Sequence, residues 1–474
     1  MILIAGCGYL GERIALQLHE AGETVLGLTH SAESAERLSK SVPFPVAACD
    51  ISDASAVDAL ATQPGMSEIK TVIHCASSGR GGADAYRRVY LGGMKNLITA
   101  FPKATPIYTS STSVYPQTDG SVVDETSPTD PDRETGQILR ETEDLVVQNG
   151  GLVARLAGIY GPERSFVLKN LLERKSGIEG GDGQGRILNQ IHKDDAASAL
   201  IQLMSKSCRG IYNVVDDTPV TQRACLEVLA EKFGLPIPPE VPPNPDRKRG
   251  WTNKAVSNAK LHSAGWRPMY PSYLDAVQND PDLVSSILTQ IESESPRSLI
   301  RRPNVVLIGL MGCGKSTVGR MVASQLGFQF ADTDQLIVEA AGRTIPQIFE
   351  TEGEEGFRRH ESAILRTLLG RDGWVIATGG GIVTQPRNCP LLRYLGYIAW
   401  LDASVETLHR RTASSRDRPL LRDGDPKAKL QSLMDARRPL YKGLADLRIV
   451  TDDLSQDEAA YGLAESVRMR FSGL

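Results

Sequence analysis

Residues 304–326, NVVLIGLMGCGKSTVGRMVASQL, constrain the fold of this 474-residue chain more than any other stretch. An apolar, β-branched run leads directly into G-x-x-x-x-G-K-S, and a helical pattern follows. A glycine-rich turn between a strand and a helix lets backbone N–H groups surround the phosphates of a nucleotide. In this motif we expect Lys315 to reach the γ-phosphate and the Ser316 hydroxyl to face Mg²⁺. The stretch therefore predicts a phosphate-binding loop (P-loop) on an α/β fold.

The length and the strand–helix alternation predict two domains. Short β-branched runs alternate with helical stretches over residues 1–230, and a second alternation starts at 304. We therefore expect an α/β protein with two doubly wound parallel-sheet domains, an N-terminal Rossmann fold and a C-terminal P-loop kinase fold. The expected boundaries are 1–285 for the first domain and 304–474 for the second. Residues 286–303 are expected to be a linker, because 281–303 lacks a strand signal and ends in a charged, proline-containing run.

Composition excludes several function classes. The net charge of −4 has no basic bias that would favour nucleic acid or an anionic membrane. No apolar run is long enough to span a bilayer, and the N-terminus lacks a basic segment and a cleavage site. Seven scattered cysteines without a C-x-x-C pair favour reduced thiols. We expect a cytoplasmic protein that acts on small molecules.

Several motifs after the P-loop suggest where an acceptor binds. Asp332 and Asp334 in FADTD follow a strand and could serve a metal and a substrate hydroxyl separately, although Asp334 could equally be only a helix cap. Arg358 lies in a helical pattern, where a solvated surface arginine is the simpler interpretation. TGGG at 378–381 permits close backbone approach to a ligand, or is a flexible turn. The arginine-dense RTASSRDRPLL at 411–421 suits a lid over phosphates, or is an ordinary basic loop.

In their order and spacing these motifs make residues 304–474 resemble shikimate kinase. The resemblance is carried by GLMGCGKST, FADTD, the FRRHE helix, TGGGIV, DRPLL and RRPLY, which places Arg437 and Arg438 at a helix end before a proline. It implies that Asp332 serves Mg²⁺ through water. It also implies that Asp334 holds the ring hydroxyls of shikimate and assists deprotonation of the attacking one.

The same resemblance implies the remaining site roles. Arg358 and Arg437 are expected to grip the shikimate carboxylate, and Gly380 to contact the substrate through its backbone. Arg418 is expected to reach the transferring phosphate, and Arg411 to pack against adenine. The residues expected to bind ATP are Gly312, Cys313, Gly314, Lys315, Ser316, Thr317, Arg411 and Arg418, and those expected to serve the metal are Ser316 and Asp332. One departure is the acidic Asp452-Asp453-Leu454, where many relatives carry a basic residue near the adenine.

Two alternatives stay open for the C-terminal half. A related P-loop kinase could phosphorylate another small hydroxy acid such as gluconate, although D-x-D, the arginine pair and G-G-G favour shikimate. The whole chain could instead be an NAD(P)-responsive regulatory protein with a vestigial kinase site, although every motif position is intact.

The N-terminus has its own nucleotide signal. Gly6, Gly8 and Gly11 form G-x-G-x-x-G between a strand and a helix, the context of a dinucleotide site, although a glycine-rich turn without a ligand is the alternative. The second strand does not end in Asp or Glu. His30 and Ser31 stand there instead, which favours NADP or a relaxed preference over strict NAD.

Residues 1–280 resemble extended short-chain dehydrogenases/reductases and sugar-nucleotide epimerases, through VIHCASS, YTSSTSVYP, RLAGIYGP and IHKDDAASAL. The resemblance implies that Asp50 lies beside adenine and that Ser111 is the family's catalytic serine. Arg133 and Gln137 stand where the family needs its Tyr and Lys, and neither side chain can exchange a proton at neutral pH. We therefore expect NAD(P) binding without hydride transfer by the usual residues. Other proton donors, Tyr115, Tyr160 and His192, are more simply structural.

Overall fold

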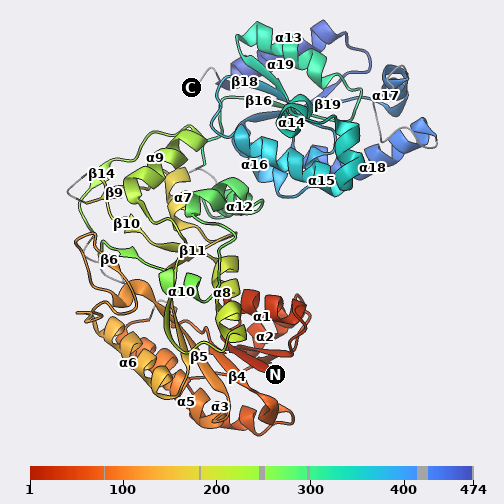
Figure 1. The fold of residues 1–474 in the computed structure, drawn as a ribbon. Helices are drawn as coiled ribbons and strands as arrows, with labels where there is room; N and C mark the ends of the chain where they lie inside the picture. Colours follow the sequence, from red (N-terminus) through yellow and green to blue (C-terminus); the bar gives the residue numbers. More distant parts are fainter. Residues whose placement is uncertain (80, 181–182, 245–250, 296–298, 414–424, 472–474) are drawn as a thin grey trace. The chain divides into compact units, whose positions relative to one another are not determined.

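The computed structural model covers residues 1–474 and describes all of them except 80, 181–182, 245–250, 296–298, 414–424 and 472–474. The chain divides into two compact units (Figure 1). Unit 1 comprises Met1–Gly161, Gly177–Cys225 and Pro239–Ala276, and unit 2 comprises Pro162–Ser176, Leu226–Pro238 and Val277–Leu474. Both units are α/β, as expected from the sequence.

Unit 1 is built on a seven-stranded parallel sheet in the order β12-β7-β5-β4-β1-β2-β3. Its strands are β1 (Ile2–Ala5), β2 (Val25–Thr29), β3 (Val46–Ala48), β4 (Thr71–His74), β5 (Thr105–Ser111), β7 (Leu152–Leu156) and β12 (Gly210–Val214). The helices are α1 (Gly11–Glu20), α2 (Ala32–Ser39), α3 (Ala54–Ala61), α4 (Ala83–Tyr86), α5 (Gly93–Ala100), α6 (Glu134–Gln148), α8 (Lys193–Ser205) and α10 (Ala259–Ser263).

The strand sequences explain why helices cover both faces of this sheet. Side chains alternate between the two faces of a strand, and in β1 every position is apolar and buried. Ile2 and Ile4 join one core with α1, α6 and α8, whereas Leu3 and Ala5 join a second core with α3 and α5. The doubly wound Rossmann architecture predicted for the N-terminal half is confirmed.

A lobe of short strand pairs completes unit 1. Parallel pairs join β8 (Gly158–Tyr160) to β11 (Gln190–His192), β6 (Val122–Val123) to β15 (Ala255–Val256), and β9 (Ile178–Glu179) to β14 (Glu240–Val241). An antiparallel pair joins β10 (Ile187–Leu188) to β13 (Val220–Thr221).

Unit 2 contains a five-stranded parallel sheet in the order β17-β18-β16-β19-β20. The strands are β16 (Val305–Ile308), β17 (Gln329–Asp332), β18 (Trp374–Ala377), β19 (Tyr397–Asp402) and β20 (Leu447–Val450). The helices are α13 (Lys315–Leu326), α14 (Thr333–Ala341), α15 (Ile345–Thr367), α16 (Asn388–Leu395), α17 (Val405–Thr412), α18 (Pro426–Leu444) and α19 (Gln456–Phe471). Figure 1 shows α13 and α19 on one face of the sheet and α16 on the other. This is the predicted P-loop kinase architecture.

The position of β16 at the centre of the sheet decides where the site lies. The fully buried β16 leads into the P-loop, and its neighbours β18 and β19 continue the sheet in opposite directions. In such open sheets ligands bind beyond the carboxyl ends of the strands at this switch point. The P-loop, the end of β17 and the TGGG turn after β18 all meet at that edge.

A helix occupies much of the stretch predicted to be a linker. Helix α12 spans Leu283–Glu294 and belongs to unit 2. The same unit contains α7 (Phe166–Leu172), α9 (Gln222–Phe233) from Leu226 onward and α11 (Tyr273–Asn279) from Val277 onward. The buried apolar residues of α12 recur at helical spacing: Leu283, Ile287, Leu288 and Ile291. The linker prediction considered only the missing strand pattern and overlooked this helical pattern. The expected boundaries at 285 and 304 stay a prediction.

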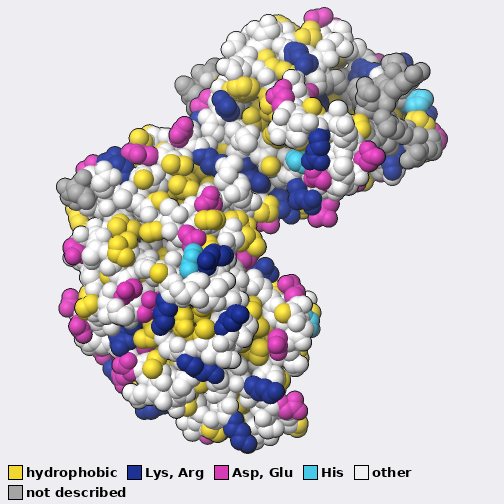
Figure 2. Space-filling model, viewed as in Figure 1, with side chains coloured by type: hydrophobic (Ala, Val, Ile, Leu, Met, Phe, Trp, Pro, Cys, Tyr) yellow, Lys and Arg dark blue, Asp and Glu magenta, His cyan; other side chains and the backbone are white. Residues whose placement is uncertain are grey.

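On the face shown in Figure 2, basic and acidic side chains are both spread over the surface. Within the described residues, no helix has the length and apolar character needed to cross a bilayer.

Candidate active site

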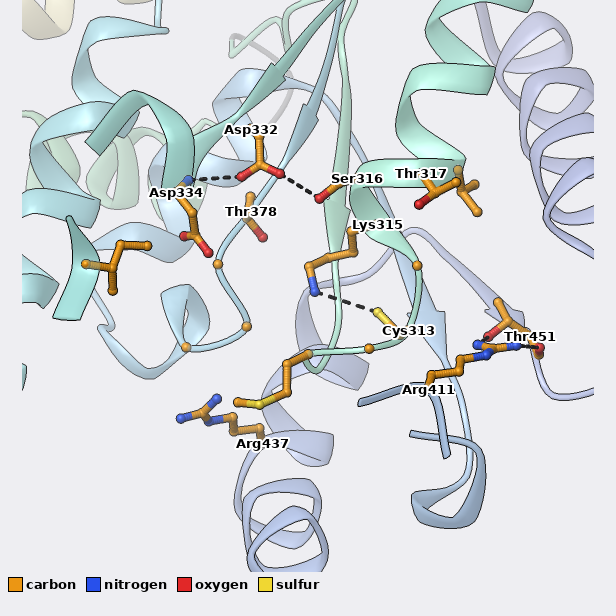
Figure 3. A pocket seen from close by; sticks show the side chains of 18 of the residues that line it. Cys313, Lys315, Ser316, Thr317, Asp332, Asp334, Thr378, Arg411, Arg437 and Thr451 are labelled. Carbon is orange, nitrogen blue, oxygen red and sulfur yellow. Dashed lines mark hydrogen bonds between the residues drawn. The ribbon is translucent and has the colours of Figure 1, made fainter. Parts of the chain in front are cut away.

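A cavity of about 730 Å³ opens at the carboxyl edge of the sheet in unit 2 (Figure 3). It is lined by every described residue that the sequence analysis assigned to ATP, metal or acceptor in this half. These are Gly312, Cys313, Gly314, Lys315, Ser316, Thr317, Asp332, Asp334, Arg358, Gly380, Arg411 and Arg437. Arg418, predicted for the transferring phosphate, lies outside the described residues. Motifs that lie between residues 312 and 437 therefore converge on one cavity.

Glycine conformation shapes the P-loop. Gly312 and Gly314 have φ of +83° and +98°, a region that other residues rarely adopt. Gly314 directly precedes α13, so the N–H groups of the first helical turn are directed at the cavity. Lys315 Nζ donates to the carbonyl oxygens of Gly309 and Leu310, at 2.7 and 3.0 Å, and lies 3.7 Å from Cys313 Sγ. The loop thus collects donors and one cation at the mouth of the cavity.

Two oxygen-bearing side chains meet beside the P-loop. Ser316 Oγ donates to Asp332 Oδ2 at 2.6 Å, and Asp332 Oδ1 accepts from the Asp334 backbone N–H at 3.0 Å (Figure 3). Asp332 is therefore the N-cap of α14, and the alternative in which Asp334 only caps its helix does not hold. Hard oxygen donors suit Mg²⁺, which takes few protein ligands and keeps waters and phosphates. In the described part of the chain there is no group of three or more His, Cys, Asp or Glu side chains that could hold a metal ion.

Arg358 is buried, contrary to the surface alternative. It is 5% exposed, and it donates to Glu361 Oε2 and to Glu354 Oε1, both at 2.7 Å. Glu361 is fully buried and lines the cavity. Burial raises the pKa of Glu361 to about 7, and the nearby Asp334 adds to the rise against the lowering by Arg358 and Arg437. Sequence reasoning missed Glu361, although its position three residues after Arg358 on a helix was the available signal.

The TGGG turn makes room for these side chains. A Cβ at Gly379 would lie 2.6 Å from Glu361 Oε1, and one at Gly381 would lie 2.2 Å from Arg358 Nη1. Gly380 lines the cavity, and its carbonyl oxygen accepts a hydrogen bond from the Tyr441 hydroxyl, a second residue that the sequence analysis missed. The glycines therefore allow close approach by protein side chains as well as leaving cavity space.

The two arginines of RRPLY separate. Arg437 is 5% exposed and lines the cavity. The Arg438 side chain is largely exposed and donates to Asp402 Oδ2 at 3.2 Å. The expectation that these arginines end a helix is wrong, because α18 continues through Pro439 to Leu444. A proline removes one backbone donor, and here the helix tolerates that loss.

Another part of the cavity lining contains Arg411, Thr451 and Leu454. The Arg411 side chain donates to Thr451 Oγ1 at 3.1 Å and to the Thr451 carbonyl oxygen at 2.7 Å (Figure 3). In the acidic segment Asp452-Asp453-Leu454, where many relatives carry a basic residue, Leu454 lines the cavity. Asp452 instead accepts from the backbone N–H and the hydroxyl of Ser404, bonds that hold the pKa of its carboxyl below the usual range. The acidic residue is thus engaged in anchoring the start of α17.

In unit 1 the three glycines of G-x-G-x-x-G have distinct environments. A Cβ at Gly6, whose φ is +95°, would lie 2.3 Å from Ala76 N, and one at Gly11 would lie 2.3 Å from the Gly6 oxygen. A Cβ at Gly8 would meet nothing within 4 Å. Two glycines therefore permit tight packing and the third faces open space, the arrangement that a pyrophosphate needs.

Asp50 follows β3 beside the end of β2. Its Oδ1 accepts from the Ser52 N–H at 2.9 Å and lies 3.6 Å from His30 Nδ1. The structure therefore brings Asp50 and His30 together at the edge where the sequence predicts the adenine side of a dinucleotide.

Four further residues of unit 1 that the sequence analysis named have partners within the protein. Ser111 ends β5 and accepts from the Ser113 N–H at 3.2 Å. Tyr115 is fully buried; its hydroxyl donates to Asn213 and accepts from Arg155, and burial raises its pKa. His192 caps α8 by accepting from the Asp194 N–H. Gln137 Nε2 donates to the Pro131 carbonyl oxygen at 3.3 Å.

Comparisons with known proteins match both halves. The shikimate kinase family model matches residues 311–468, and the NAD dependent epimerase/dehydratase family model matches residues 2–214. A shikimate kinase from Thioalkalivibrio sulfidiphilus is 48% identical over 166 residues, which are 35% of this chain and 87% of that protein. A shikimate kinase from Cupriavidus pinatubonensis is 51% identical over 150 residues, which are 32% of this chain and 78% of that protein.

A solved structure bears on the fold of the N-terminal half. UDP-glucose 4-epimerase from Stenotrophomonas maltophila superposes with a TM-score of 0.51 at 18% identity, covering 62% of this chain and 99% of that one. Identity this low supports the shared fold alone. Residues 2–214 match the NAD dependent epimerase/dehydratase family model, and through its C-terminal part this chain belongs to the shikimate kinase family.

Proposed function

We propose that the C-terminal domain transfers the γ-phosphate of ATP to the 3-hydroxyl of shikimate. The observation that carries the proposal is that Asp334, Arg358 and Arg437 line the same cavity as the P-loop. Two guanidinium groups suit a carboxylate, since their paired N–H donors match its two oxygens. A carboxylate beside them suits ring hydroxyls, so this wall complements a small, anionic, polyhydroxy acceptor. Relatives named shikimate kinase, 48% and 51% identical, support the same acceptor.

The residues divide the work of transfer. Ser316 and Asp332 would hold Mg²⁺, which when bound neutralises charge on the phosphates. Lys315 would exchange its bonds to the loop carbonyls for the γ-phosphate, and the P-loop N–H groups would hold the phosphate chain. Asp334 would accept a hydrogen bond from the attacking hydroxyl, while Arg358, Arg437 and Gly380 orient the ring. Arg411 would pack against adenine, and Arg418 would reach the transferring phosphate. Catalysis of this type rests on positioning and charge neutralisation.

An ADP-release assay on the full chain with shikimate and with gluconate tests the acceptor. We expect turnover with shikimate, because its carboxylate and adjacent hydroxyls match the arginine pair and Asp334. Turnover with gluconate alone would refute the proposal. Absence of ATP-dependent turnover with either acceptor would favour a regulatory protein with a vestigial kinase site.

We infer that unit 1 binds NAD(P), with NADP or a relaxed preference over strict NAD, and has no hydride transfer by the usual residues. The open space at Gly8 and the position of Asp50 beside His30 support this inference. Fluorescence quenching with NADP and NAD tests it, and failure of both to bind would reduce unit 1 to a scaffold. The seven free cysteines suit a cytoplasmic protein.

A further inference from the structure

Lys254 of unit 1 is a buried cation for which the described residues provide no counter-ion. The residue is 4% exposed, and it lies one position before β15. Its ammonium group carries three N–H donors, and within the described part of the chain its one hydrogen bond runs to Thr252 Oγ1, at 3.0 Å. No carboxylate among those residues pairs with it.

The charge at this position is costly. Burial, and then the nearby Arg186 guanidinium, lower the pKa of Lys254 to about 8, so the ammonium form still dominates at neutral pH. Burying a cation without a partner costs free energy that packing does not return. A second cation close by increases the cost. An anion bound beside the Lys254 ammonium group would offset the free-energy cost of burying its charge.

The position of Lys254 connects it to the ligand edge of the sheet. The Lys254 carbonyl oxygen accepts from Asn189 Nδ2 at 2.8 Å, and the Asn189 carbonyl oxygen accepts from the Gly158 N–H at 3.1 Å. Gly158 is exposed and begins β8, two residues beyond β7. Two hydrogen bonds therefore link the Lys254 backbone to the start of β8, which follows the carboxyl end of β7. In such folds ligands bind beyond the carboxyl ends of the parallel strands.

Polar atoms on the segments connected to Lys254 also have no hydrogen-bond partner among the described residues. Within the described part of the chain, the buried atoms Gln117 Oε1, Gln190 Oε1 and Trp251 Nε1 make no hydrogen bond. Gln117 is held against this segment through its carbonyl oxygen, which accepts from the Asn253 N–H, and Gln190 follows Asn189. Native interiors leave few buried polar atoms unpaired, so several in one neighbourhood point to a ligand.

We propose that Lys254 binds an anionic group, a carboxylate or a phosphate, of a small-molecule ligand of unit 1. The proposal is independent of the kinase reaction, because it concerns the domain whose family catalytic pair is replaced by Arg133 and Gln137. It assigns unit 1 a ligand class while leaving open whether chemistry follows binding.

Replacement of Lys254 by methionine in the full chain tests the proposal through thermal unfolding. In sodium chloride we expect Lys254→Met to raise the melting temperature of unit 1 by about 2–4 °C, because it removes an unpaired buried charge while preserving the stem. Millimolar phosphate or acetate, at matched ionic strength, should raise the melting temperature of the wild type and not that of the variant. Which of the two anions acts identifies the group. Any anion bound at the P-loop contributes equally to both proteins.

Two further variants complete the design. Lys206→Met removes an exposed lysine of the same unit and should change neither the melting temperature in chloride nor the response to anions. Lys254→Gln keeps a donor for Thr252 without the charge, and should lose the anion response as methionine does. A lower melting temperature for Lys254→Met in chloride would overturn the proposal, because it would make the lysine structural. So would anion protection that survives in either Lys254 variant, or its absence from the wild type.

Discussion

Glu361 provides a quantitative test of the part of the cavity that we propose binds the acceptor. It is fully buried, and its pKa is raised from 4.5 to about 7 with burial as the largest cause. A group whose folded pKa is raised stabilises the fold in its protonated form. That contribution is complete below pH 4.5 and is lost as the pH rises through 7. At about 1.4 kcal/mol per pKa unit, the loss is about 3 kcal/mol.

Glu361→Gln removes this titration. The stability of the variant relative to the wild type should therefore rise by about 3 kcal/mol between pH 4.5 and pH 8.5, whatever its value at the acid end. For a unit of this size the change corresponds to roughly 6–12 °C in melting temperature. The loss of the bond to Arg358 sets only the starting value, because the part of that interaction that changes with protonation is already contained in the folded pKa of Glu361.

Thermal unfolding of wild type and variant, followed in parallel at several pH values, measures the difference directly. Glu354→Gln is the matched control, since it removes from the same guanidinium a carboxylate that is 59% exposed. A relative stability of Glu361→Gln that is flat across this range would refute the reasoning. It would mean that the bond to Arg358 keeps Glu361 ionised throughout.

Three further variants test the other walls of the cavity and unit 1. Lys315→Ala should lower kcat at least roughly 100-fold in the ADP-release assay, because the transferring phosphate loses its cation; activity that survives would mean the site is placed wrongly. Arg437→Lys should raise the KM for shikimate roughly 10-fold and leave the KM for ATP unchanged, since lysine cannot form the paired bonds; a change confined to ATP would contradict its assignment. Gly8→Val should abolish NADP binding in fluorescence titrations without lowering the melting temperature, because its Cβ enters open space; retained binding would remove the dinucleotide from this loop.

The sequence alone predicted the features that depend on neighbours along the chain. The P-loop needs glycines at fixed spacing between a strand and a helix, and the structure has β16, Gly312, Gly314 and α13 in that order. The alternation of strands and helices likewise predicted both parallel sheets, since local periodicity decides which face of each element is buried. Motif order led to Asp334, Arg358 and Arg437, which line one cavity.

Tertiary structure decided which side chains meet. Glu361 contacts Arg358 and lies against the glycine turn, and Tyr441 reaches Gly380 from a helix 61 residues later. Arg437 and Arg438 are adjacent and equally charged, yet only the first lines the cavity, because the helix directs them to different faces. The spacing of Glu361 to Arg358 is visible in the sequence, but the complete burial of Glu361 is decided by packing, and so is the absence of a counter-ion for Lys254 among the described residues.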